Sequence, residues 1–92
     1  MLVSVIKSNR IDKRYKAIFS NGKVVHFGSK IGSTFLDHRN IIKRFNYLKR
    51  HGAMESWIDP YKASTLSAYI SWGNNYTMSD NIFEFNKVFF NT

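Results

Sequence analysis

The stretch FSNGKVVHFG, residues 19–28, constrains the fold more than any other part of the sequence. Its Asn21-Gly22 pair lies between two segments rich in β-branched and aromatic residues, and such a pair is the strongest short-range signal for a β-hairpin. Both residues tolerate the positive φ that a type I′ turn requires. The sequence therefore predicts a two-residue loop that joins antiparallel strands at 14–19 and 23–27.

A two-residue loop also determines which side chains share a face of the predicted sheet. It places Ala17 opposite His26 and Tyr15 opposite Gly28. Directly opposed residues point to the same face, and neighbours along a strand alternate between faces. Tyr15 and His26 are therefore predicted to share one face, while Phe27 lies on the other.

The segments on either side of the hairpin predict one more strand and a basic helix. Residues 2–7 are rich in β-branched residues and read as the first strand. The Gly- and Ser-containing segment 28–35 is predicted to be a connector, because it lacks the glycine spacing of a phosphate-binding loop. Asp37 is expected to cap a helix over 38–51, which Gly52 would close.

Two further helices are predicted in the second half of the chain. Asp59 followed by Pro60 is a typical helix start, and this helix is expected to stop at Gly73. A third helix is predicted over 79–90 from its apolar spacing. The cap of this third helix is expected to be one of two hydroxyl residues, Thr77 or Ser79.

Each predicted helix carries an apolar stripe that would pack on the sheet. A chain of 92 residues forms one core, so we expect a single domain, 1–92. The predicted fold is α+β, with an N-terminal three-stranded antiparallel meander (1–28) followed by three helices packed on one face (37–90). The predicted buried stripes are Ile41, Ile42, Phe45 and Leu48, then Ala63, Leu66 and Ile70, and finally Ile82, Phe85 and Phe89.

The positive charge is concentrated in the first part of the chain. The formal net charge is +8, and residues 1–52 hold 12 of the 14 Lys and Arg residues but two of the six Asp and Glu residues. A one-sided charge of this kind attracts nucleic acid or an acidic protein surface. The residues predicted to contact nucleic acid are Lys16, Lys23, Lys30, Arg39, Lys43, Arg44, Lys49 and Arg50.

Several kinds of site have no support in the sequence. There is no cysteine, and the three histidines do not have the spacing of metal ligands, so we predict no metal and no cofactor. The apolar start of the chain is too short for a membrane span, and we expect no transmembrane segment.

One group of residues resembles a small family of uncharacterised proteins encoded by nucleocytoplasmic large DNA viruses, among them giant viruses and algal viruses. The resemblance covers roughly residues 14–90, and the chain departs from the pattern at Ala63-Ser64, where the family usually has Ala-Gly. It implies a virus-encoded protein made in the host cytoplasm, at the viral factory, with packaging in the virion as a further expectation. The residues that carry it are His26-Phe27-Gly28, Tyr47, Arg50-His51, Glu55, Trp57, Asp59-Pro60 and Trp72.

The hairpin also resembles, more weakly, the start of a GIY-YIG nuclease. In such a site, two strand residues on one face, a helix arginine and a metal-binding carboxylate act together. Tyr15, His26, Arg39 and Glu55 (or Glu84) would take these positions here, although the GIY and YIG triplets themselves are replaced. The resemblance implies hydrolysis of a phosphodiester with a bound Mg²⁺.

These observations favour a small basic structural or binding protein without catalytic activity. The expected partner is nucleic acid or another acidic surface, contacted through phosphates with little reading of base sequence. A minor capsid or cement protein is the first alternative, because the aromatic C-terminal helix offers apolar surface to capsid neighbours. A GIY-YIG-like nuclease, degenerate or active, is the second alternative.

Overall fold

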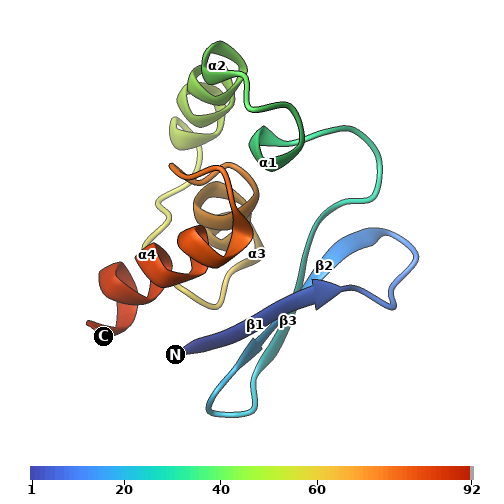
Figure 1. The fold of residues 1–92 in the computed structure, drawn as a ribbon, viewed down its shortest axis with the longest axis vertical. Coiled ribbons are helices and arrows are strands. Elements are labelled where there is room, and N and C mark those ends of the chain that lie inside the picture. Colours follow the sequence, from blue (N-terminus) through green and yellow to red (C-terminus); the bar gives the residue numbers. More distant parts are fainter. Residues whose placement is uncertain (92) are drawn as a thin grey trace.

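The computed structural model describes residues 1–91 and confirms the predicted α+β class. Strands β1 (Leu2–Lys7), β2 (Lys13–Phe19) and β3 (Val24–Ser29) form one antiparallel sheet in the order β1-β2-β3. The helices follow the sheet in the chain, and Figure 1 shows the helical part above one side of it. They are α1 (Phe35–His38), α2 (Ile41–Gly52), α3 (Ala63–Leu66), the π-helical turn η1 (Ser67–Ser71) and α4 (Met78–Phe90).

The hairpin between β2 and β3 forms at the predicted place, but its predicted register is wrong by one residue. Phe19 N donates a hydrogen bond to Lys23 O, and Phe19 O accepts one from Gly22 N. Phe19 and Lys23 therefore face each other, and three residues, 20–22, form the loop. Gly22 has a φ of 88°, the left-handed conformation that typically ends a three-residue hairpin loop. The strand pairs are consequently Tyr15 with Phe27 and Lys16 with His26.

Burial of hydrophobic surface explains why this register is stable. A slip of one residue moves every side chain of a strand to the other face. In the observed register Phe27 joins Ala17 and Phe19 on the face under the helices, and all three side chains are buried. The predicted register would have placed His26 there and exposed Phe27. His26 instead lies on the outer face, where its Nδ1 is 2.7 Å from Ser8 Oγ.

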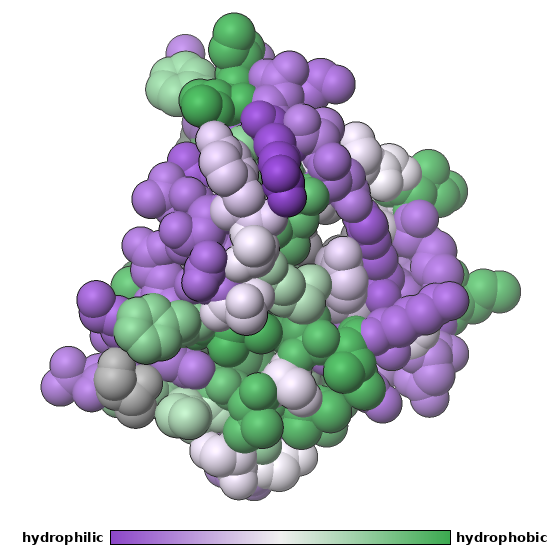
Figure 2. Space-filling model, in the orientation of Figure 1, coloured by the Kyte–Doolittle hydropathy of each residue, from purple (hydrophilic) through white to green (hydrophobic). Residues whose placement is uncertain are grey.

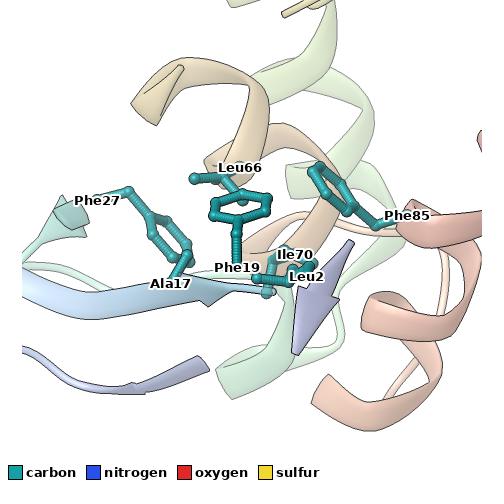
Figure 3. Packing of buried hydrophobic residues seen from close by; sticks show 7 residues of the cluster. All are labelled: Leu2, Ala17, Phe19, Phe27, Leu66, Ile70 and Phe85. Atoms are coloured by element: carbon teal, nitrogen blue, oxygen red, sulfur yellow. The ribbon is translucent and has the colours of Figure 1, made fainter. Parts of the chain in front are cut away.

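The core forms where the sheet meets α3, η1 and α4. Figure 3 shows Phe19 of β2 pointing toward Leu66, Ala17 of β2 beside Phe27, and Phe85 of α4 on the other side of the cluster. The stripes predicted for the second and third helices are confirmed, because Leu66, Ile70 and Phe85 are fully buried. The remaining stripe residues pack against them while partly exposed: Ala63, Ile82 and Phe89.

The first and last elements of the chain are joined by one buried side chain. Asn86 of α4 accepts a hydrogen bond from Leu2 N through Oδ1 (2.8 Å) and donates one to Leu2 O through Nδ2 (2.9 Å). The amide thus supplies both bonds that a neighbouring strand would give to the edge strand β1. Figure 1 shows β1 and α4 side by side.

The predicted helix over 38–51 is two helices. Arg39 adopts a left-handed conformation (φ 55°) that ends α1, and Asn40 caps α2 by accepting a bond from Lys43 N. Asp37 is therefore not the cap of α2. Its carboxylate accepts a bond from the backbone N–H of Thr34 (2.7 Å) and so closes the first turn of α1.

The second predicted helix also differs at its start, which lies at Ala63 rather than after Pro60. Asp59 first forms a turn, in which its Oδ1 accepts a bond from Tyr61 N (2.9 Å). The third helix is capped by Thr77, whose hydroxyl accepts a bond from Asp80 N (3.2 Å). Of the two caps that the sequence allowed, Thr77 and Ser79, it is therefore Thr77 that caps α4.

Three of the four residues in the apolar stripe predicted for the first helix are exposed, and only Leu48 is partly buried. Ile41, Ile42 and Phe45 are 65%, 72% and 63% exposed. Helix α2 lies at the far end of the molecule from the sheet (Figure 1), and hydrophobic side chains form part of its surface there (Figure 2). Helix α2 therefore packs on the protein through its more polar side.

Candidate nucleic-acid interface

Arg44 fixes the orientation of α2. Its Nε donates to the carbonyl oxygens of Trp72 (2.9 Å) and Gly73 (3.2 Å), which follow η1, and its guanidinium lies 5.7 Å from the centre of the Phe35 ring. These bonds occupy backbone acceptors that a helix end leaves free. Arg44 is thus committed to the fold, although the sequence placed it among the nucleic-acid contacts.

A stack of aromatic rings continues this contact. Tyr47 and Trp72 are parallel, with ring centroids 4.1 Å apart and an interplanar angle of 3°. His51 packs against Tyr47 at 4.2 Å, and the His38 ring meets Trp72 edge-on at 5.3 Å. The Tyr47 ring consequently lies between two neighbours, and neither of its faces is free.

Four residues of α2 form a polar row beside this stack. Lys43, Asn46, Tyr47 and Arg50 are spaced three and four residues apart, so they lie on one side of the helix. Together they line a hollow of about 420 Å3. Its other walls are Ser33, His38 and Trp72.

A second hollow of about 380 Å3 adjoins the first. Both are lined by Ser33, Tyr47, Arg50 and Trp72, so we treat them as one feature and call it the α2 groove. One wall of the second hollow is formed by Gly28 and Ser29 at the end of β3 and by four residues of the connector between β3 and α1, Ile31, Gly32, Ser33 and Thr34. The connector is shorter than the predicted segment 28–35, because β3 continues to Ser29 and α1 begins at Phe35.

Ser71 of η1 lies against the second hollow, but its hydroxyl is buried. The residue is 1% exposed and lines the second hollow. Within the described part of the chain its Oγ has no hydrogen-bond partner, and a buried hydroxyl without a partner costs about 1–3 kcal/mol. Because this oxygen is not accessible to solvent, a ligand in the hollow would not reach it without a movement of η1.

The Tyr47 hydroxyl is a neutral donor. Burial raises the pKa of Tyr47, because the charged phenolate would lose hydration, and the nearby Arg50 opposes this shift only in part. The groove therefore presents fixed positive charge from Lys43 and Arg50, together with neutral donors. No negative side chain lines either of its two hollows.

The other cations predicted to bind nucleic acid are dispersed. Lys16 lies on the outer face of the sheet opposite His26. Lys23 lies 4.5 Å from the centre of the Tyr61 ring, and Arg39 lies 5.4 Å from that of Tyr76. The remaining two are exposed but line neither hollow: Lys30 in the connector and Lys49 on α2.

The four residues of the nuclease resemblance do not form a common site. Tyr15 and His26 lie on opposite faces of the sheet, because the register differs by one residue from the predicted one. Tyr15 packs on Phe27 under the helices, whereas His26 faces outward. Arg39 lies between α1 and α2 against Tyr76, and Glu55 follows α2.

Two further types of site have no counterpart in residues 1–91. No cluster of three or more histidine and acidic side chains could hold a metal ion in this part of the chain. None of its helices is long and apolar enough to cross a membrane.

Sequence reasoning found Lys43 and Arg50 but missed the rest of the groove. The spacing of Asn46 and Tyr47 relative to these cations is visible in the sequence and could have predicted a polar row. The roles of Ser33 and Ser71 had no local signal, since they depend on how the connector and η1 meet α2.

Comparison with known proteins gives one match. Residues 3–51, more than half of the chain, match the Family of unknown function (DUF5754). The match includes most of the sheet and nearly all of α2, and therefore both cations of the groove. No curated protein and no solved structure matches the chain. The chain belongs to this family of unknown function, DUF5754.

Proposed function

We propose that this protein binds nucleic acid through its phosphate backbone, with the α2 groove as the contact surface, and that it is not an enzyme. The observation that carries this proposal is that Lys43 and Arg50 both line one groove whose lining includes no acidic side chain, with Glu55 close enough to Tyr47 to affect its pKa but outside that lining. Cations in such a position replace the counterions of a phosphate chain, which is the main source of sequence-independent affinity.

The polar groups around the two cations fit phosphate oxygens. Asn46 and Ser33 offer donors at the groove wall, and side chains of this kind commonly contact phosphate and sugar. Thr34 also lines the groove, but its hydroxyl donates to Asp37. These groups would fix the position of a backbone without reading its sequence.

Base stacking is less well supported than backbone contact. Stacking requires an exposed aromatic face, and Tyr47 is covered by Trp72 and His51. A base could reach the Tyr47 ring only by displacing His51. We therefore expect the protein to bind nucleic acids of different base sequence with similar affinity. This affinity should depend on the phosphate charge rather than on base composition.

The resemblance to proteins of large DNA viruses supports a more specific setting. Under this proposal the protein is virus-encoded, acts in the host cytoplasm where viral genomes are handled, and enters the virion with its nucleic acid. A net charge of +8 suits such a role, since it neutralises phosphates over the whole surface and increases the rate of encounter.

The second candidate function is that of a minor capsid protein. The observation that favours it is the exposed apolar surface of α2, which is unusual for a protein that works alone. Binding to protein neighbours and to nucleic acid use different sides of α2, so the two functions are compatible.

Fluorescence anisotropy of labelled duplex and single-stranded DNA tests the proposal. Binding to both is expected at low salt and should weaken as salt rises. The double variant Lys43→Ala/Arg50→Ala should bind more weakly, and its log–log salt slope on duplex should be flatter by about 0.9 for each lost phosphate contact. The DNA, incubated with Mg²⁺, should remain intact.

The matched control is Lys7→Ala/Lys62→Ala, which removes the same charge from exposed positions outside the groove. It should retain most of the affinity of the unchanged protein. Equal losses in both variants would show that net charge alone determines binding. Absence of binding at low salt, or cleavage of the DNA, would contradict the proposal.

A further inference from the structure

Helix α2 has an outer face that nothing in the described chain covers. We define the α2 outer face as Ile41, Ile42, Phe45 and Lys49. Its three apolar residues are among the most exposed large side chains of the helix, and Lys49 lies among them on the helix surface, at position i+4 from Phe45. The face is therefore apolar and positively charged.

Helix α4 has an exposed face of the opposite charge. We define the α4 outer face as Asp80, Phe83, Glu84, Lys87 and Val88, which lie on one side of the helix. Lys87 lies 5.7 Å from the centre of the Phe83 ring, so two carboxylates and one cation leave this face with a formal charge of −1. Phe83 and Val88 are 66% and 56% exposed. The face includes a hollow of about 240 Å3 lined by Asn75, Asp80, Phe83, Glu84 and Lys87.

We propose that the α2 outer face of one copy of this protein binds the α4 outer face of a second copy. Each face has apolar side chains of a size that a partner helix could cover. Their charges are complementary, because Lys49 would approach Asp80 and Glu84 of the neighbouring copy. Burial of Phe45 against Phe83 would supply the apolar contact.

Contacts between like faces are disfavoured by charge. Pairing α2 with α2 would bring Lys49 residues together, with Lys43 and Arg50 on the same helices. Pairing α4 with α4 would bring together Asp80 and Glu84 of both copies, and Lys87 would offset only part of their repulsion because carboxylates outnumber cations on this face. Like charges placed against each other reduce affinity, so charge selects the unlike pair.

When the α2 outer face of one copy binds the α4 outer face of the next, one α2 outer face and one α4 outer face remain free at the two ends of the assembly. Such head-to-tail contacts form either closed rings or open chains. The contact between two helix faces is small, so association is expected to be weak and to depend on concentration. The α2 groove lies on another side of the helix and would remain accessible in every copy.

Sedimentation of two single-face variants tests the arrangement. Phe45→Glu blocks the α2 outer face and Phe83→Lys blocks the α4 outer face. The unchanged protein should form species larger than a monomer as its concentration rises, and each variant alone should be monomeric. An equimolar mixture of the two variants should form a heterodimer, because one intact face of each kind remains, and should stop there.

The controls separate this arrangement from its alternatives. Ile11→Glu changes a 92% exposed residue outside both faces and should associate like the unchanged protein. Circular dichroism and melting temperature show that each variant is folded, and nuclease treatment removes bound nucleic acid. A monomer at all concentrations, or self-association of Phe83→Lys alone through α2, would overturn the inference.

Because no nucleic acid is present, the result is independent of the function proposed above. Binding of DNA by a monomer would contradict only the contact between copies. Association without DNA binding would contradict only the groove.

Discussion

Gly73 is a residue whose small size the fold requires. It follows η1, and Arg44 of α2 contacts its carbonyl oxygen. A Cβ atom at this position would overlap the carbonyl oxygen of Tyr69 and lie 2.6 Å from Cγ of Asn81. Asn81 is buried and itself donates to Ile70 O (2.8 Å), so its side chain cannot move away without breaking this bond.

We therefore expect Gly73→Ala to lower the free energy of unfolding by about 1–3 kcal/mol or more, as overpacking of a tight site does. Gly52→Ala is the matched control, since its Cβ would lie 3.3 Å from the partly exposed Trp57 ring and should change stability by less than about 1 kcal/mol. Urea denaturation measures both variants. Equal midpoints for the two would show that the chain around Gly73 can relax.

At the scale of elements, one ion pair links the sheet to the first helix. Arg14 of β2 donates to Asp37 of α1 through both terminal nitrogens, at 2.7 and 2.6 Å. This pair holds the pKa of Asp37 below its usual range, and the backbone N–H of Thr34 adds to the effect. The Asp37 carboxylate also accepts the bond from Thr34 that closes the first turn of α1. It therefore positions the end of the connector that lines the α2 groove.

The pair predicts a specific loss of stability in acid. Because the pKa of Asp37 is lower in the folded than in the unfolded chain, its contribution is present above the unfolded value of about 3.9 and is lost as pH falls toward the folded value. Asp37→Asn should therefore be less stable than the unchanged protein near neutral pH, and the difference should shrink below about pH 4.

Thermal unfolding at a series of pH values measures this difference. Asp12→Asn is the control, since Asp12 pairs with Arg10 across 3.4 Å while both side chains are more than half exposed; such pairs contribute little. A difference between Asp37→Asn and the unchanged protein that stays constant down to acidic pH would contradict the role assigned to the pair.

At the scale of the whole molecule, α2 is the part least covered by the rest. The core lies between the sheet, α3, η1 and α4, whereas α2 has no buried residue. Its position depends on Arg44 and on the stack of Tyr47 against Trp72. Elements with few buried contacts open at lower free energy than the core.

We expect Arg44→Lys to loosen α2 without unfolding the domain. Lysine retains the charge but lacks the planar guanidinium that contacts two carbonyl oxygens, and hydrogen bonds to charged groups contribute about 1.5–3 kcal/mol. Amide hydrogen exchange should therefore become faster in α2 and stay unchanged in β2. Lys49→Arg, on the exposed side of α2, serves as the control, and uniform acceleration in all elements would contradict this local effect.

The sequence by itself determined the local structure and the fold class. The Asn21-Gly22 hairpin, the strand over 2–7 and the third helix are all present, because turn propensity and apolar spacing act over a few residues. The stripe of Leu66 and Ile70 is buried as predicted, since a period of 3.6 residues leaves that helix one apolar side.

Only the tertiary structure decided the register of the hairpin and the orientation of α2. Burial of Phe27 under distant helices selects the three-residue loop, and this separates Tyr15 from His26. Arg44 turns α2 so that its apolar stripe is exposed and Lys43 and Arg50 line a groove. Both outcomes depend on contacts between residues far apart in the chain, which local patterns do not encode.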